Sequence, residues 1–127
     1  MKLNPDLLRE IMFALEEDPN RFNLPARKPV DGHTWEETEA HLCPLIELEI
    51  VRGFVCQTTA DPVDGPTKPV AMANGGLTAR GQMIAMEMHD DTLWKRSKER
   101  AGKVALAVTT AAVGQVVSYF LKGADPR

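Results

Sequence analysis

The segment that most restricts the fold of this chain is residues 104–121, which contain no formally charged side chain. At the helical period it predicts a helix with bulky residues on one side and small residues on the other. The bulky side consists of Leu106, Val113, Val116, Val117 and Phe120. The small side consists of Ala107, Thr110, Ala111, Gly114 and Ser118. Such a helix needs a core, a second copy of the chain or a membrane to cover it.

A membrane is the weaker of these alternatives. Eighteen uncharged residues reach the lower limit for a transmembrane helix, and small residues four positions apart are typical of helix pairs in membranes. The polar residues Thr109, Thr110, Gln115 and Ser118 lower the hydrophobicity of the segment. We therefore favour a buried helix that closes the core or forms a homodimer through the small side, with a membrane-associated helix 104–121 as the alternative.

The composition predicts one globular domain. The chain has 127 residues, of which 43% are hydrophobic and 26% are charged. Fifteen Lys and Arg against 18 Asp and Glu give a net charge of -3, which disfavours a general nucleic-acid binder. Two cysteines without a CxxC pair do not form the framework of a disulfide-rich secreted domain, and no apolar signal segment follows Lys2, so we expect a cytoplasmic protein.

The N-terminal region predicts a helix followed by a connector. Asn4 is a good N-cap, Pro5 suits the first helical position, and Leu3 can pack on Leu8. Apolar residues at helical spacing define the buried face: Leu7, Leu8, Ile11, Met12 and Leu15. The helix should end at residues 18–20, and residues 21–32 should form an extended connector with at most a short strand.

A second helix is predicted from Thr34, because Thr34 and Glu37 form the pattern of a capping box. The apolar pattern continues to about Ile50. Pro44 removes one backbone donor and crowds the carbonyl of Ala40, so we expect a kink or a restart near Cys43, at a cost of roughly 3 kcal/mol, unless the packing accommodates the proline.

A β-hairpin should follow, with residues 54–59 as the first strand and residues 70–73 as its partner across the loop 61–69. The order helix, short strand, helix, hairpin is that of a winged helix. We therefore predict an α+β fold with a winged-helix-like core over residues 1–76. Residues 77–127 would add C-terminal helices that pack on this core as one structural domain. The first of these helices should be capped by Thr78 and carry Ile84, Met88 and Trp94 on its inner side, with an interruption near Gly102.

Three stretches resemble a known family: NPDLLREIMFALEEDP, TWEETEAHLCPLIELEIVRGFV and LTARGQMIAMEMHDDTLWKRSKE. The family consists of small uncharacterised bacterial and phage-associated proteins and is catalogued as a domain of unknown function. The most specific part is LT-x-x-G followed by DDT-x-W-x-x-x-K, here Leu77, Thr78, Gly81, Asp90, Asp91, Thr92, Trp94 and Lys98. The resemblance implies a winged-helix-like fold, frequent phage or prophage origin and a turn or capping role for Asp90 and Asp91. It implies no activity and no catalytic residues.

The second helix is strongly acidic, which argues against the usual DNA-reading role of that helix in a winged helix. Between residues 35 and 50 there is no Lys or Arg, but there are five glutamates: Glu36, Glu37, Glu39, Glu47 and Glu49. These residues form our candidate partner-binding set, which would dock on a basic protein surface. The simpler alternative is a solvated acidic face.

A basic segment lies near the end of the chain and is the candidate nucleic-acid contact: Lys95, Arg96, Lys98, Arg100 and Lys103. The alternative function is therefore a DNA-binding transcriptional regulator that uses residues 95–103. The simpler interpretation is a solvated helix end, because Glu99 interrupts the charges and they surround much of the helix.

Metal and catalytic sites are not predicted. His41, Cys43, Cys56 and His89 do not have zinc-ligand spacing, and Cys43 is more simply a buried apolar residue. His89 and Asp90 lack the further ligands that a metal phosphohydrolase requires. We expect no cofactor, and a non-enzymatic, phage- or prophage-associated adaptor, regulator or inhibitor of host machinery that acts through an unidentified protein partner.

Overall fold

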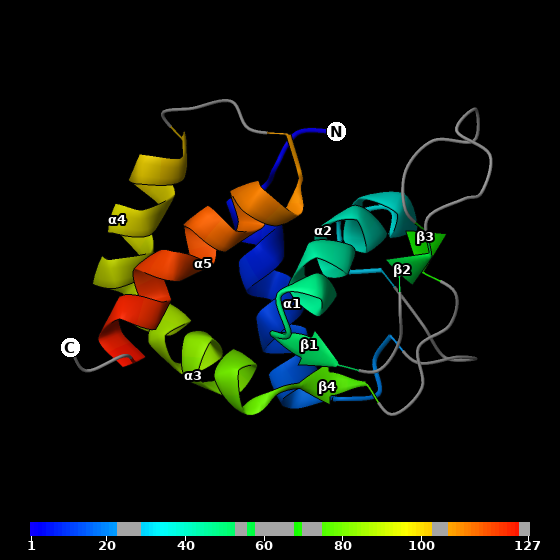
Figure 1. Cartoon of the computed structure of the whole chain (residues 1–127), viewed down its shortest axis with the longest axis horizontal. Helices are drawn as coiled ribbons and strands as arrows, with labels where there is room; N and C mark the ends of the chain where they lie inside the picture. The colour runs from blue at the N-terminus through cyan, green and yellow to red at the C-terminus, as the bar shows by residue number, and fades with distance from the viewer. Residues whose placement is uncertain (23–28, 53–55, 58–67, 70–74, 103–106, 125–127) are drawn as a thin grey trace.

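A computed structural model describes residues 1–22, 29–52, 56–57, 68–69, 75–102 and 107–124, and these residues form an α+β fold (Figure 1). The helices are α1 (Pro5–Glu17), α2 (Trp35–Glu47), α3 (Ala79–Met88), α4 (Asp91–Gly102) and α5 (Thr110–Ala124). The strands are β1 (Val51–Arg52), β2 (Cys56–Gln57), β3 (Lys68–Pro69) and β4 (Gly76–Leu77).

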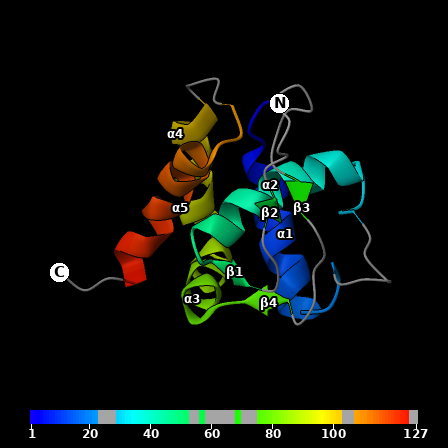
Figure 2. The same ribbon diagram turned by 45° about the vertical axis from the view of Figure 1, so that its right-hand side comes forward.

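The helices pack around α1. Helix α1 contacts α2, α3 and α4, and α5 packs across both α2 and α3 (Figure 1). The turned view shows α4 and α5 next to each other, with β2 and β3 beside α2 (Figure 2). The helices therefore carry the core, and the short strands lie at its edge.

The strands form two short antiparallel ladders. Strand β1 pairs with β4, with Val51 opposite Leu77, and β2 pairs with β3, with Cys56 opposite Pro69. Strand β2 lies within the predicted first strand, but its partner β3 differs from the predicted residues 70–73. Residues 68–69, assigned to the loop, pair with β2. Val51 and Leu77, which face each other in the first ladder, are both buried. Of the predicted strands, only Cys56 and Gln57 lie within the described residues.

The predicted helix starts at the N-terminal side are confirmed. The Asn4 side chain accepts hydrogen bonds from the backbone N–H groups of Asp6 and Leu7. Thr34 and Glu37 form the reciprocal capping box, with each side chain accepting from the other residue's backbone N–H. All five predicted apolar residues of α1 are buried.

The second helix does not restart near Cys43. Helix α2 continues through Pro44 to Glu47, and the carbonyl of Pro44 accepts from the N–H of Leu48. Pro44 lies three residues before the last residue of the helix, so it removes a backbone donor near the end of the element, and its ring is buried. The helix also ends before Ile50, because Glu49 has a φ of 60° and turns the chain toward β1.

The prediction of a single helix that begins after Thr78 and includes Trp94 is wrong. Helix α3 ends at Met88, and α4 begins at Asp91. The side chain of Asp90 accepts from the backbone N–H groups of Thr92 and Leu93, which is the geometry of an N-cap. The capping role implied by the family resemblance is therefore confirmed for Asp90.

The last helix starts later than predicted. Ala107 pairs with Lys2 in an isolated β-bridge, the N–H of Val108 donates to the carbonyl of Met1, and α5 begins only at Thr110. Thr109 precedes α5, and its hydroxyl accepts from the N–H of Ala112. These contacts with the N-terminus hold residues 107–109 outside the helix, so Ala107 does not share its small face. Residues 103–106 lie outside the described part of the chain.

The bulky side of α5 is buried, as predicted. Its described residues are each at most 2% exposed: Val113, Val116, Val117 and Phe120. Phe120 lies against Trp94, with ring centroids 5.9 Å apart. One core cluster contains residues from Leu3 to Phe120, so both residues 1–76 and residues 77–127 contribute to it. Among the described residues, no helix has the length and apolar character needed to cross a membrane.

Candidate functional site

The five glutamates predicted to bind a partner divide into two groups. Glu36, Glu47 and Glu49 are exposed, whereas Glu37 and Glu39 are half-buried. Helix α2 buries its opposite side against α1 and α5. The glutamates of α2 therefore lie on an outer face, Glu49 follows the end of the helix, and not all five are available to a partner.

Glu37 has a structural role in the folded chain. Its carboxylate completes the capping box and lies 3.3 Å from Nδ1 of His33, whose Nε2 lies 3.5 Å from the carboxylate of Glu10. The hydrogen bonds from His33 and from the Thr34 backbone hold the pKa of Glu37 below its usual value of 4.5. Through His33, this carboxylate links the start of α2 to α1.

Glu47 is also engaged within the chain, because its carboxylate accepts a hydrogen bond from the hydroxyl of Thr110 at the start of α5. Within the described part of the chain, Glu36, Glu39 and Glu49 make no ion pair. We call these three residues the α2 acidic surface.

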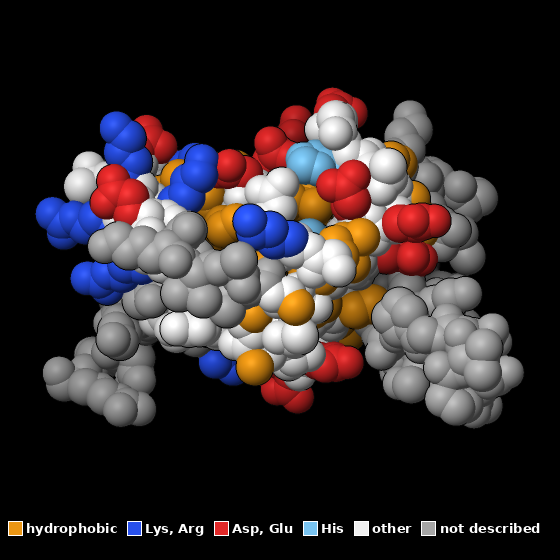
Figure 3. All heavy atoms as spheres, turned by 90° about the horizontal axis from the view of Figure 1, so that it is seen from above, with side chains coloured by type: hydrophobic (Ala, Val, Ile, Leu, Met, Phe, Trp, Pro, Cys, Tyr) orange, Lys and Arg blue, Asp and Glu red, His pale blue; other side chains and the backbone are white. Residues whose placement is uncertain are grey.

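The predicted basic segment is exposed on α4. Lys95, Arg96, Lys98 and Arg100 are all exposed, and Lys98 forms a 2.8 Å ion pair with Asp6 of α1. Lys103 lies outside the described residues. Figure 3 shows that most Lys and Arg side chains on that face gather at the end formed by α4, whereas most Asp and Glu side chains lie toward the opposite end. On this face, positive and negative side chains are thus largely separated.

The small side of α5 is partly covered by α2. Thr110 donates to Glu47, and Gly114 lies next to Leu48, because a Cβ at Gly114 would be 3.6 Å from a Leu48 methyl group. Ala111 is exposed, and Ser118 donates to the carbonyl of Gln115. Part of the candidate dimer face is therefore already used by an intramolecular contact.

The family motif residues hold the helices together. Arg9 of α1 donates to Asp91 and to the Met88 carbonyl, each at 3.0 Å, and its guanidinium lies 5.0 Å from the ring centroid of Trp94. Lys98 binds Asp6, as described above. The second half of the motif therefore fixes α4 against α1, and these contacts are structural.

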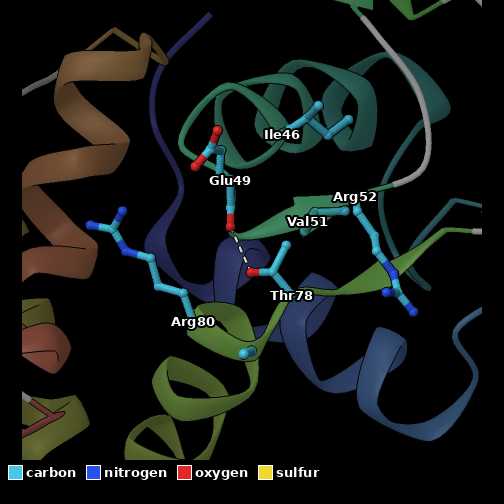
Figure 4. Close-up of a pocket in the computed structure, with 7 residues that line it drawn as sticks. Ile46, Glu49, Val51, Arg52, Thr78 and Arg80 are labelled. Atoms are coloured by element: carbon cyan, nitrogen blue, oxygen red, sulfur yellow. Dashed lines mark hydrogen bonds between the residues drawn. The ribbon is translucent and has the colours of Figure 1, made fainter.

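The first half of the motif joins α3 to the end of α2. The hydroxyl of Thr78 donates to the carbonyl of Glu49 at 2.6 Å and accepts from the N–H of Gly81 (Figure 4). Gly81 lies so close to the Ile50 carbonyl that a Cβ would be 2.1 Å from its oxygen. The glycine thus allows the close approach of two backbones.

His41 and Cys43 have structural roles. His41 is 1% exposed; its Nε2 accepts from the N–H of Asn4 at 2.9 Å, and its Nδ1 donates to the carbonyl of Glu37 at 2.8 Å. Cys43 is buried, as predicted, but it is disulfide-bonded. No group of three or more potential metal ligands occurs among the residues that the structure describes.

Two clefts that the sequence did not reveal flank β1. The first has a volume of about 490 Å³ and is lined by Ile46, Glu49, Val51, Arg52, Thr78, Ala79 and Arg80 (Figure 4). The second has a volume of about 390 Å³, and we call it the His89 cleft. It is lined by Leu15, Glu16, Pro19, Arg52, Gly76, Leu77, Gln82, Met86 and His89. Four separate segments meet in the second cleft, so no local spacing in the sequence predicts it.

These features define a small α+β domain with helices at its core and motif residues that stabilise the fold. The chain belongs to the family described as hypothetical protein (DUF2513), whose model matches residues 2–107. The resemblance to a domain of unknown function is therefore confirmed. The match includes both halves of the motif and ends before α5. No curated protein and no solved structure matches the chain.

Proposed function

We propose that this domain is a non-enzymatic interaction module that binds a basic surface of a protein partner through the α2 acidic surface. The observation that carries the proposal is the exposure of the carboxylates of Glu36, Glu39 and Glu49 and their lack of an ion pair within the described residues. These carboxylates are at least partly exposed, and within the described residues they have no cationic partner. Complementary charge on a partner would accelerate association and select against acidic surfaces.

The proposed architecture is winged-helix-like. Its support is the order of α1, α2 and the two antiparallel ladders, which together have the arrangement of an interrupted hairpin. In this proposal the acidic α2 replaces the basic reading helix of a DNA binder. The phage or prophage association implied by the family resemblance extends the proposal to an adaptor, regulator or inhibitor of host machinery.

The test compares two charge-neutralising variants. Glu36→Gln/Glu39→Gln removes two carboxylates of the α2 acidic surface, and Glu17→Gln/Asp18→Asn removes two exposed carboxylates at the end of α1. Each protein is used to capture partners from a lysate of the native host, and the affinity of the captured partner is then measured with purified components. We expect the α2 variant to bind at least about fivefold more weakly, with the difference decreasing at high salt.

Equal affinity of both variants for the captured partner contradicts the proposal, as does a partner that binds tightly at high salt.

The alternative function, DNA binding, is favoured by Lys95 and Arg96, which are exposed on α4 and have no ion pair within the described residues. A gel shift that is abolished in Lys95→Gln/Arg96→Gln and weakens steeply with salt would establish that alternative. The homodimer remains a prediction, with Thr110, Ala111, Gly114 and Ser118 as its candidate face.

A further inference from the structure

The His89 cleft combines an apolar floor with polar groups of defined position. Leu15 and Leu77, which line it, are largely buried, and Met86 at its rim is 66% exposed. A volume of about 390 Å³ lies within the range of small-molecule sites. An exposed methionine beside a cleft is an adaptable apolar contact. The cleft can therefore receive a small apolar group.

One wall of the cleft is held rigidly. The ring of His89 stacks on Phe13 with centroids 4.1 Å apart and an interplanar angle of 5°, and its Nε2 is 2.8 Å from the Glu16 carboxylate. These two contacts fix both the plane and the rotation of the imidazole. Glu16 is thereby paired with His89, and Nδ1 of His89 makes no hydrogen bond within the described part of the chain.

Arg52 supplies a positive charge to the same cleft. The guanidinium makes no ion pair within the described residues. Although Arg52 lines both clefts, its Nε would be 3.9 Å from a Cβ at Gly76, and Gly76 lines the His89 cleft alone. In Figure 4 its side chain extends away from Glu49 and Arg80, which line the other cleft. The anion-binding group is therefore directed toward the His89 cleft.

The charges of the cleft select the kind of anion. A guanidinium binds a carboxylate or a phosphate through paired hydrogen bonds. The Glu16 carboxylate in the same cleft offsets the charge of Arg52 and repels a dianion more strongly than a monoanion. A single carboxylate beside an apolar group therefore fits this lining better than a phosphate does.

We propose that the His89 cleft binds a monocarboxylate that carries a short apolar side chain. Arg52 holds the carboxylate, Leu15, Leu77 and Met86 contact the apolar group, and His89 and Gln82 lie beside its remaining polar atoms. The same chemistry is present in a free N-acylated amino acid and in the C-terminal residue of a peptide. This site is separate from the α2 acidic surface and does not depend on the function proposed for it.

The experiment titrates the full-length protein with N-acetyl-leucine and with N-acetyl-leucinamide, which lacks the carboxylate, and follows backbone amide shifts by NMR. We expect saturable shifts at Leu77, Gln82 and His89 with the acid only. Arg52→Gln should weaken binding about tenfold or more, because it removes a charged hydrogen-bond donor. Arg80→Gln, which removes an arginine that lines only the other cleft, should leave the affinity within twofold.

A second arm compares acetyl-Gly-Gly-Leu with N-acetyl-leucine. Tighter binding of the tripeptide identifies a peptide C-terminus as the ligand, and equal or weaker binding identifies a free small acid. Three results overturn the proposal: equal shifts with acid and amide, equal weakening by Arg52→Gln and Arg80→Gln, or no shift with either acid up to about 10 mM. Thermal melting of both arginine variants verifies that each is folded, so a loss of binding reports on the site.

Discussion

His41 shows how one buried side chain joins two helices. Its Nε2 accepts from the N–H of Asn4, the N-cap of α1, and its Nδ1 donates to a carbonyl of α2. These contacts define the neutral tautomer that carries its proton on Nδ1. Protonation of Nε2 would replace an acceptor by a second donor facing the Asn4 N–H. Burial accordingly lowers the pKa of His41 below its ordinary value of 6.5.

The stability of the protein should therefore depend on pH through His41. Because the folded-state pKa is lowered, the unfolded chain binds the proton more readily. The stability associated with neutral His41 is fully present above pH 6.5 and is lost as the pH falls from 6.5 toward the folded-state pKa. Urea denaturation at pH 7.5 and pH 5.5 measures the loss, before most carboxylates begin to titrate.

The matched variant is His41→Gln, which keeps an acceptor but does not titrate. We expect it to be less stable than the parent at pH 7.5, because a smaller amide replaces a packed imidazole, and to lose less stability between pH 7.5 and pH 5.5. An equal loss in both proteins would show that the pH dependence arises elsewhere.

At the scale of the elements, the start of α3 depends on a close approach between backbones. Thr78 caps the helix and binds the carbonyls of Glu49 and Ile50, and Gly81 leaves space for the Ile50 carbonyl. The turn at Glu49, the ladder of β1 with β4 and the first turn of α3 are thereby joined into one unit. Residues of this unit line both clefts: Glu49, Val51 and Thr78 line the first (Figure 4), and Gly76 and Leu77 line the His89 cleft.

Two glycine-to-alanine variants test this approach. Gly81→Ala places a Cβ 2.1 Å from a backbone oxygen, so we expect a loss of about 2 kcal/mol or more in the free energy of unfolding. Gly114→Ala on α5 places its Cβ 3.6 Å from Leu48 in ordinary contact, so the better helix propensity of alanine should raise stability by up to about 1 kcal/mol. Urea denaturation of both variants gives the comparison, and a Gly81→Ala protein as stable as the parent would contradict it.

The sequence predicts the helix caps and helix faces that depend on residues close to one another in the chain. The caps at Asn4, Thr34 and Thr78 each use a side chain and a backbone donor two or three positions away, and all three are present. The break at Asp90 does not follow from the apolar pattern alone, and only the family motif indicates the cap at this residue. The predicted apolar face of α5 is correct for the same reason as that of α1, since both follow from periodicity.

Features that depend on distant segments could not be predicted in this way. The pairing of β1 with β4 joins Val51 to Leu77 across the chain, and residues 107–109 stay outside α5 where Ala107 pairs with Lys2. In the candidate sites, the hydroxyl of Thr110 donates a hydrogen bond to Glu47. Arg52 and His89 come from different elements and line the same cleft. Charge counting identified the acidic and basic segments, but it did not show which side chains already have partners.

At the scale of the whole molecule, the core is completed by a segment that the family match does not include. The match covers residues 2–107, whereas α5 begins at Thr110 and packs on α2 and α3. Its buried side chains are Val113, Val116, Val117 and Phe120. At about 1.5–3 kcal/mol for each buried side chain, their contribution is comparable to the entire stability of a typical domain.

Deletion of residues 110–127 should therefore abolish cooperative folding. Without α5, Trp94 and the facing sides of α2 and α3 lose their apolar cover, and the truncated chain should show poor amide dispersion by NMR and no sharp thermal transition. Within the full chain, Phe120→Ala should cost about 3–5 kcal/mol, because the ring is fully buried against Trp94. Gln115→Ala, on the exposed side of the same helix, should change stability by less than about 0.5 kcal/mol. A truncated protein that melts cooperatively near the temperature of the full chain would mean that residues 1–109 form a sufficient core, and α5 would then be an accessory element on their surface.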